Sequence, residues 1–206
     1  MKNNSKNSYL MTPSLLNSWI YAIESEKGTV EDFLQTLNRV PTPSNEYIEK
    51  GFMFEKWCEE NYIPNLLGLD VQGGIFQYAA KKIITVDETQ FLLYGRMDCL
   101  KAGTIYDFKY TGSYDCGKYY DSPQTSAYFE LVPEAREMVY VVTEGAGHGG
   151  NEEFEAGNNA SSLAIFTETY RRDEAKPIAV YIREFMNWLE LQNYAGIYKE
   201  RWEALE

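Results

Sequence analysis

The stretch Tyr94–Thr111 constrains the fold more than any other part of this sequence. Polar residues alternate with apolar and aromatic ones on both sides of Ala102-Gly103, a pair that favours a tight turn between two strands. With that turn as the centre of the pairing, Leu100 lies opposite Ile105. Because strand side chains alternate with a period of two, one face of the hairpin is apolar and is predicted to face the core. That face consists of Leu93, Gly95, Met97, Cys99, Tyr106, Phe108 and Tyr110.

The other face of the hairpin gathers four charges. The same register places Asp98 opposite Asp107 and Arg96 opposite Lys109. An ionic ladder on an exposed face would place opposite charges across from one another, and only the diagonal pairs relieve the repulsion here. Directly opposed Cβ atoms lie about 5 Å apart, so two ionised aspartates need a proton or a cation between them. A divalent cation held by oxygen ligands explains this arrangement better than the ladder does.

Composition limits the kinds of protein this chain represents. With 206 residues, 44% of them hydrophobic, the sequence predicts one globular domain spanning 1–206. The net charge of −12 argues against binding nucleic acid through overall electrostatics. A local basic groove or bound cations would override that argument. The candidates for such a groove are Lys50, Lys56, Arg96, Lys109 and Lys118.

The cysteines and the N-terminus predict a cytoplasmic protein. Cys58, Cys99 and Cys116 are odd in number and form no C-x-x-C pair, which indicates reduced thiols and neither a disulfide framework nor a zinc site. Residues 1–8 lack the apolar region of a signal peptide and are predicted to be a disordered tail. No run approaches the length of a membrane span, so we expect no membrane partner.

The remaining pattern predicts an α/β or α+β fold with a central mixed sheet, an antiparallel meander and flanking helices. A Gly-, Asn- and Glu-rich stretch at 145–161 has no periodicity and is predicted to be a mobile loop. Helices are expected at 12–28, 30–37, 45–62, 121–131 and 177–205, and strands at 74–86, 91–100, 104–111, 136–143 and 162–171.

The charged face of the hairpin suits phosphodiester chemistry. Asp98 and Asp107 would bridge a metal ion, with the carbonyl of Phe108 as a third ligand. Lys109 would hold a water or a phosphate oxygen beside that ion. A site of this kind supplies an activated hydroxide and neutralises charge during cleavage.

A further acidic ligand is available from the helix predicted at 45–62. Glu55 follows Gly51 by four residues and shares its helix face. A mid-helix glycine costs about 1 kcal/mol relative to alanine, so Gly51 is predicted to allow close approach of the sheet or of a substrate. On helix arguments alone, a solvated surface role for Glu55 is favoured.

Four motifs in order resemble those of the PD-(D/E)XK nuclease superfamily. They are Gly51-x-x-x-Glu55, Gly95-Arg-Met-Asp98, Ile105-Tyr-Asp107-Phe-Lys109 and Gln124-x-x-x-Tyr128. The last motif makes the RecB-like exonuclease branch the most similar. The resemblance covers residues 51–128, and four motifs at suitable spacing are far more specific than Asp-x-Lys alone.

The resemblance implies a restriction-endonuclease-like core that uses Mg²⁺ or Mn²⁺. Asp98, Asp107 and Glu55 would be metal ligands, and Lys109 the catalytic lysine. The residues implied to support the site and contact nucleic acid are Gln124, Tyr128, Arg96 and Gly51.

The sequence also departs from that branch. Glu55 stands where the branch often has histidine, and Met97 precedes Asp98 where proline is common. Three scattered cysteines exclude the four-cysteine iron–sulfur cluster of some members.

The sequence therefore predicts a metal-dependent deoxyribonuclease, most simply an exonuclease of bacterial or phage recombination or repair. Its expected partners are linear duplex or single-stranded DNA and a recombination or repair protein, and the choice between DNA and RNA and the oligomeric state stay open. One alternative is an inactive member of the fold that binds nucleic acid or protein. Another is a retaining glycosidase using Asp98 and Asp107 at about 5 Å. Lys109 and Arg96 weigh against it, because they would keep both carboxylates ionised.

Overall fold

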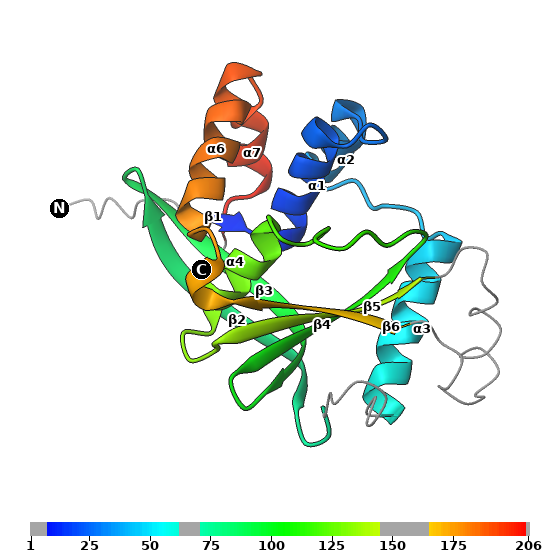
Figure 1. Cartoon of the computed structure of the whole chain (residues 1–206). Helices are drawn as coiled ribbons and strands as arrows, with labels where there is room; N and C mark the ends of the chain where they lie inside the picture. Colours follow the sequence, from blue (N-terminus) through cyan, green and yellow to red (C-terminus); the bar gives the residue numbers. More distant parts are fainter. Residues whose placement is uncertain (1–7, 62–70, 145–164, 205–206) are drawn as a thin grey trace.

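The computed structural model describes residues 8–61, 71–144 and 165–204 as a mixed sheet flanked by helices (Figure 1). The strands are β1 (Ser8–Met11), β2 (Ile75–Val86), β3 (Thr89–Lys101), β4 (Thr104–Thr111), β5 (Glu137–Glu144) and β6 (Ile165–Arg171). The helices are α1 (Pro13–Glu24), α2 (Val30–Leu37), α3 (Glu46–Asn61), α4 (Pro123–Leu131), α6 (Ile178–Leu191) and α7 (Ala195–Arg201), with a 3-10 turn η2 (Arg172–Glu174).

The sheet combines parallel and antiparallel pairs, as the sequence predicted. Its path runs β1-β3-β4-β5-β6, and β2 pairs with β3 outside this path. The β1–β3 and β4–β5 pairs are parallel, and the other pairs are antiparallel. The fold is therefore an α/β fold with six strands. Among the described helices, none is long and apolar enough to cross a membrane.

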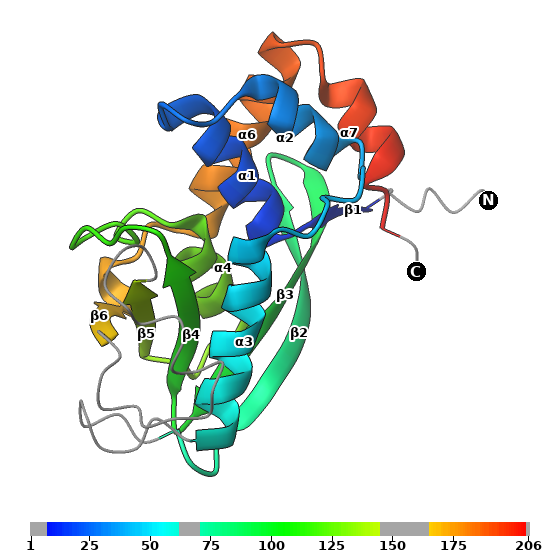
Figure 2. The same cartoon turned by 90° about the vertical axis from the view of Figure 1, so that its right-hand side faces the viewer.

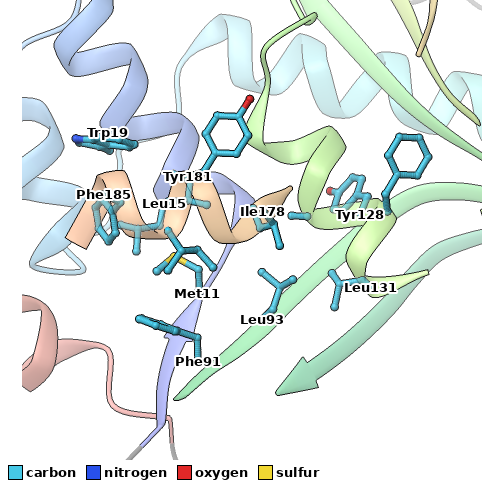
Figure 3. Packing of buried hydrophobic residues seen from close by; sticks show 14 of the residues in the cluster. Met11, Leu15, Trp19, Phe91, Leu93, Tyr128, Leu131, Ile178, Tyr181 and Phe185 are labelled. Atoms are coloured by element: carbon cyan, nitrogen blue, oxygen red, sulfur yellow. The ribbon is translucent and has the colours of Figure 1, made fainter. Parts of the chain in front are cut away.

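Helices cover both faces of the sheet. On one face α3 packs over β4 and β5, where Phe54 and Cys58 meet Phe108 and Val141 in a small core. On the other face α1, α2, α4, α6 and α7 enclose the larger core, whose central part is seen in Figure 3. Figure 1 shows α3 apart from the remaining helices. Of the four charges predicted for one face of the hairpin, Asp107 is buried, Asp98 and Lys109 are half-buried, and Arg96 is exposed.

Local capping explains where the helices begin. The side chain of Thr12 accepts the amide hydrogen bond of Leu15 at 3.2 Å and starts α1 at Pro13. The side chain of Asn45 accepts from the Ile48 amide at 3.0 Å, so α3 begins at Glu46. The predicted helix at 30–37 matches α2 in both bounds.

Strand β1 was missed by the sequence analysis. Ser8 was assigned to the disordered tail, but Ser8–Met11 pairs in parallel with Gln90–Leu93, and Met11 is fully buried. A four-residue strand whose partner lies about 80 residues away leaves no local pattern. The rest of the predicted tail, 1–7, and the predicted loop at 145–161 lie outside the described residues.

The hairpin register is confirmed at the turn and wrong beyond it. Ala102 and Gly103 have φ of 50° and 84°, and the ladder pairs Cys99 with Tyr106 and Leu100 with Ile105. The pairing stops there, so Asp98 is not paired with Asp107 across the ladder, nor Arg96 with Lys109. The reason is that β4 leaves β3 and continues along β5 as far as Thr111–Glu144.

The departure of β4 opens a split in the sheet. On the edge of β3 opposite β2, Gln90–Leu93 pair with β1 and Cys99–Lys101 pair with β4. Residues Tyr94–Asp98 between them have no strand partner on that edge among the described strands. The ladder to β2 also skips Asp98, opposite Gln77, whose φ is 53°. We call Tyr94–Asp98 the split.

Candidate active site

Helix α4 closes the split from one face of the sheet. The hydroxyl of Tyr128 donates to the carbonyl of Arg96 at 2.7 Å and so satisfies an acceptor of the unpaired segment. A Cβ on Gly95 would lie 2.8 Å from Cε1 of Tyr128 and 2.9 Å from Cδ1 of Leu131. Glycine at position 95 therefore permits the contact between α4 and β3, and two predicted motifs meet here.

Asp107 and Lys109 form an ion pair beneath the start of α4. Asp107 is 1% exposed, and its Oδ2 lies 2.6 Å from Nζ of Lys109. Its Oδ1 accepts a hydrogen bond from Nε2 of Gln124 at 2.5 Å. The Asp-x-Lys and Gln-x-x-x-Tyr motifs therefore contact each other directly.

The side-chain amide of Gln124 is the hub of this network. Its Nε2 also donates to the hydroxyl of Tyr128 at 3.1 Å. Its Oε1 accepts from Nζ of Lys109 and from Nδ2 of Asn17, each at 3.3 Å. Both donors and both lone pairs of the amide are thus used. This arrangement fixes the Lys109 ammonium relative to Asp107.

Asn17 was missed by the sequence analysis. It lies on α1, more than 100 residues before Gln124, to which it bonds. The available signal was a polar side chain between Leu16 and Trp19 in an apolar helix, which is also the pattern of ordinary helix surface.

Asp98 lies at the end of the split, where the charge of Glu55 on α3 acts on it. Oδ2 of Asp98 accepts a hydrogen bond from the amide of Phe108 at 2.7 Å. Glu55 accepts a hydrogen bond from the side chain of Gln77 on β2. Gln77, like Asn17, belonged to no predicted motif.

The three carboxyl groups share an unfavourable environment. Burial, followed by the charges of Asp107 and Glu55, raises the pKa of Asp98 well above its usual value, against the opposing effect of Lys109. Burial also raises the pKa of Asp107, although Lys109 and Gln124 act to lower it. Burial is again the main cause that raises the pKa of Glu55.

The sequence analysis expected Lys109 and Arg96 to keep both aspartates ionised. Lys109 does act to lower the pKa of both, but burial acts more strongly and the pKa of each is raised. For Lys109 itself, burial acts to lower the pKa, but the carboxylates of Asp107 and Asp98 prevail and raise it. Lys109 is therefore a charged ammonium at neutral pH.

The residues present suit a hard divalent cation in their chemistry. Oδ2 of Asp107 is buried and accepts no hydrogen bond from the described residues, and the Lys109 ammonium meets it as an ion pair. Carboxylate oxygens are the preferred ligands of Mg²⁺ and Mn²⁺. In the described ranges, however, no three His, Cys, Asp or Glu side chains lie close enough together to hold a metal ion. The positive charge beside Asp107 comes from Lys109.

The site opens into a cavity of about 540 Å³, which we call the central cavity. Arg96, Lys109, Gln124 and Tyr128 line it from β3, β4 and α4, and Asn17 lines it from α1. Neither Asp98 nor Asp107 lines it. A group bound in the central cavity therefore meets the ammonium of Lys109 before it meets the carboxylates.

The other predicted residues have different surroundings. In the described part of the chain, nothing lies within 4 Å of a Cβ built on Gly51, so this glycine serves no close packing with the sheet. The ring of Phe108 packs under α3. Of the predicted groove cations, Lys118 lines neighbouring cavities, whereas Lys50 and Lys56 form ion pairs with Glu46 and Glu60 along α3.

Comparison with known proteins identifies the fold only. No model of a known protein family matches the chain, and no curated protein matches it. A solved crystal structure of a protein named SSO0001 is similar, with a TM-score of 0.50 and 16% sequence identity. The match covers 93% of this chain and 80% of that chain. The chain therefore shares its α/β architecture with SSO0001.

Proposed function

We propose that this protein is a metal-dependent deoxyribonuclease of the PD-(D/E)XK type, acting as an exonuclease in bacterial or phage recombination or repair. The observation that carries the proposal is the contact between Asp107, Lys109 and Gln124 at the split. It holds a charged ammonium and an orienting amide at the wall of one cavity, with a buried carboxylate behind them.

The charge balance of the site supports a bound cation. Asp98, Asp107 and Glu55 influence one another electrostatically, and all three pKa values are raised. Lys109, and for Glu55 also Arg96, act to lower these pKa values but do not offset burial. Asp98 and Asp107 would hold Mg²⁺ or Mn²⁺, with Glu55 as the further acidic group. A divalent ion there would lower the pKa of bound water and neutralise charge on a phosphate.

The protein's own groups have separate tasks. Lys109 donates to a non-bridging phosphate oxygen from the wall of the central cavity. Gln124 holds that ammonium in place through its bonds to Asp107 and Tyr128. Arg96 is exposed at the same cavity and contacts a neighbouring phosphate.

The glycosidase alternative lacks support at this site. A retaining mechanism needs a carboxylate that attacks the sugar directly. Asp107 is 1% exposed and does not line the cavity. The raised pKa of Asp98 would suit a protonated acid, but Asp107, the nucleophile of the predicted pair, is buried.

The test is degradation of labelled linear DNA, duplex and single-stranded, by the full chain with Mg²⁺, with Mn²⁺ and with excess EDTA. We expect metal-dependent loss of label in the wild type and none in Lys109→Met, which keeps the side chain's length. Lys199→Ala, on the exposed surface of α7, is the matched control and should stay active.

Two results would overturn the proposal. One is undiminished cleavage in EDTA or by Lys109→Met. The other is no cleavage of any DNA by a folded wild-type chain that also fails to bind Mn²⁺ in a calorimetric titration. The second result would favour the alternative that this protein is an inactive member of the fold.

A further inference from the structure

The central cavity continues into two more cavities along α1. A second cavity of about 490 Å³ shares Asn17, Lys109 and Gln124 with it. A third of about 840 Å³ shares Tyr21 and Lys118 with the second. Figures 1 and 2 show α1 beside the segment that joins β4 to α4, and these two elements supply the walls. We call the three connected cavities the groove.

Exposed tyrosines collect in this groove. Among the described residues, the tyrosines exposed by more than a third are Tyr21 at 53%, Tyr47 at 60%, Tyr94 at 40% and Tyr120 at 67%. Every one of them lines one of the three cavities. The other exposed large hydrophobic residues line none of the three: Ile23, Val40, Phe52, Met53, Ile75, Ile83, Phe166 and Leu191. Exposed aromatic surface is thus concentrated on the path that leads from Lys109.

The charge of the outer groove is mixed. In the second cavity Lys109 and Lys118 stand against Glu24 and Asp121. In the third, Lys27 and Lys118 stand against Glu26 and Asp115. Dense positive charge, which dominates the binding of duplex DNA, is missing from this lining. The occupant is therefore held mainly by contact with the rings.

We propose that the groove binds the unpaired nucleotides of a nucleic-acid strand, whose bases stack on Tyr21 and Tyr120. The choice of nucleic acid rests on the proposed nuclease function, because the groove begins at Lys109 and Gln124. Base stacking on aromatic rings tolerates any sequence, since every base has a π face. A duplex hides those faces inside its stack, so the lining selects an unpaired strand.

Glu168 on β6 positions the wall that carries Tyr120. Its Oε1 accepts hydrogen bonds from the hydroxyl of Tyr114 and the amide of Gly117, both at 2.6 Å. The hydroxyl of Tyr170 donates to its Oε2. Burial acts to raise the pKa of Glu168, but these hydrogen bonds prevail and lower it, which keeps the carboxylate ionised.

A second anchor lies next to Tyr120. The ring of Tyr119 stacks on buried Tyr140, with centroids 4.5 Å apart and planes at 14°. The wall is thus fixed by Glu168 before Tyr120 and by Tyr119 beside it. The ring of Tyr120 is therefore held in place before a strand binds, so binding costs little conformational entropy in this wall.

The experiment measures binding without cleavage, by fluorescence anisotropy in EDTA. The probes are a fluorescein-labelled 15-nucleotide DNA strand and the blunt duplex of the same sequence. One stacked base contributes about 1–3 kcal/mol, so Tyr21→Ala and Tyr120→Ala should each weaken single-strand binding about fivefold to 150-fold. Tyr21→Phe and Tyr120→Phe keep the ring and should bind nearly as the wild type does, as should Leu191→Ala on α6.

Glu168 is tested with the same probe. Glu168→Ala should weaken binding although it removes no residue of the groove, and Glu168→Gln, which keeps an acceptor oxygen, should restore most of it. A melting temperature measured for each variant separates displacement of the wall from unfolding. Equal binding by Glu168→Ala and the wild type would remove Glu168 from the proposal.

The two proposals fail separately. If wild type and tyrosine-to-alanine variants bind the single strand equally, or if the duplex binds more tightly, the stacking groove is wrong whatever the chain cleaves. If binding depends on the tyrosines but no DNA is cleaved with either metal and the chain does not bind Mn²⁺, the groove stands and the nuclease function falls.

Discussion

The backbone amide of Phe108 donates a hydrogen bond to Oδ2 of Asp98 at 2.7 Å, where β3 and β4 cease to pair. In a continuous ladder that amide would meet a carbonyl of the neighbouring strand. Here a carboxylate takes the carbonyl's place and is drawn into the sheet. The same contact that ends the hairpin therefore sets Asp98 beside Asp107.

Asp98→Asn should stabilise the protein at neutral pH. The asparagine oxygen can still accept from Phe108, and the variant removes a charge that burial and Asp107 disfavour. Because the folded pKa is raised, the folded state holds its proton more tightly, and stability falls as pH rises from about 3.9 to the folded pKa. The advantage of the variant should thus be larger at pH 7.5 than at pH 4.5.

Thermal unfolding at the two pH values measures this difference. Each kcal/mol changes the melting temperature by about 2–4 °C in a domain of this size. Glu190→Gln, an exposed carboxylate change on α6, should show little effect at either pH. A loss of stability in Asp98→Asn at pH 7.5 would mean that the ionised carboxylate supports the fold.

The hairpin illustrates what local sequence determines. The Ala102-Gly103 turn and the first pairs beside it were predicted because turn chemistry and alternation act over a few residues. The split was not, because β4 stays paired with β5 on its other edge along its whole length while it separates from β3. The β4–β5 pairs join segments about 30 residues apart, and the alternation of side chains is the same whether or not β3 follows β4.

Gln124→Leu should destabilise the protein and lower its activity. Leucine has a similar size but leaves Oδ1 of Asp107 buried without the amide that meets it at 2.5 Å. Loss of a partner for a buried acceptor costs about 1–3 kcal/mol. Urea unfolding measures the change, and Gln192→Leu at the end of α6 is the control. If Gln124→Leu is as stable as the wild type, the ion pair with Lys109 is enough to stabilise the buried Asp107 carboxylate.

The candidate site also combines residues that local motifs predict with residues that only the tertiary structure reveals. Asp98, Asp107, Lys109, Gln124 and Tyr128 were predicted through ordered motifs, and the fold brings them together. Asn17 bonds to Gln124 from α1, and Gln77 bonds to Glu55 from β2, without any motif. A single polar side chain on a helix or strand is common on any surface, so only tertiary contact distinguishes it.

Gly51→Ala should stabilise α3 and, under the proposed function, reduce cleavage. Within a helix, alanine favours the folded state by about 1 kcal/mol relative to glycine. Apart from the neighbouring residues and backbone of α3 itself, no described atom lies within 4 Å of the new methyl group. The methyl group would instead occupy space left for the substrate on the face shared with Glu55. Gly196→Ala on α7 is the matched control, also with open space, and should leave activity unchanged. Full activity in Gly51→Ala would assign Gly51 to helix surface alone.

Glu88→Gly should stabilise the turn between β2 and β3. Asp87 and Glu88 have φ of 45° and 67°, the left-handed region that costs a residue with a Cβ about 1–2 kcal/mol. Asp87 accepts two hydrogen bonds from Arg183, at 2.7 and 3.0 Å, so it is kept. Glu88→Ala loses the same side-chain contacts but keeps a Cβ in the left-handed conformation. The difference between the glycine and alanine variants therefore measures the cost of that backbone conformation alone. We expect the glycine variant to melt a few degrees above the alanine variant. Equal melting temperatures would show that the positive φ of Glu88 does not destabilise the folded protein.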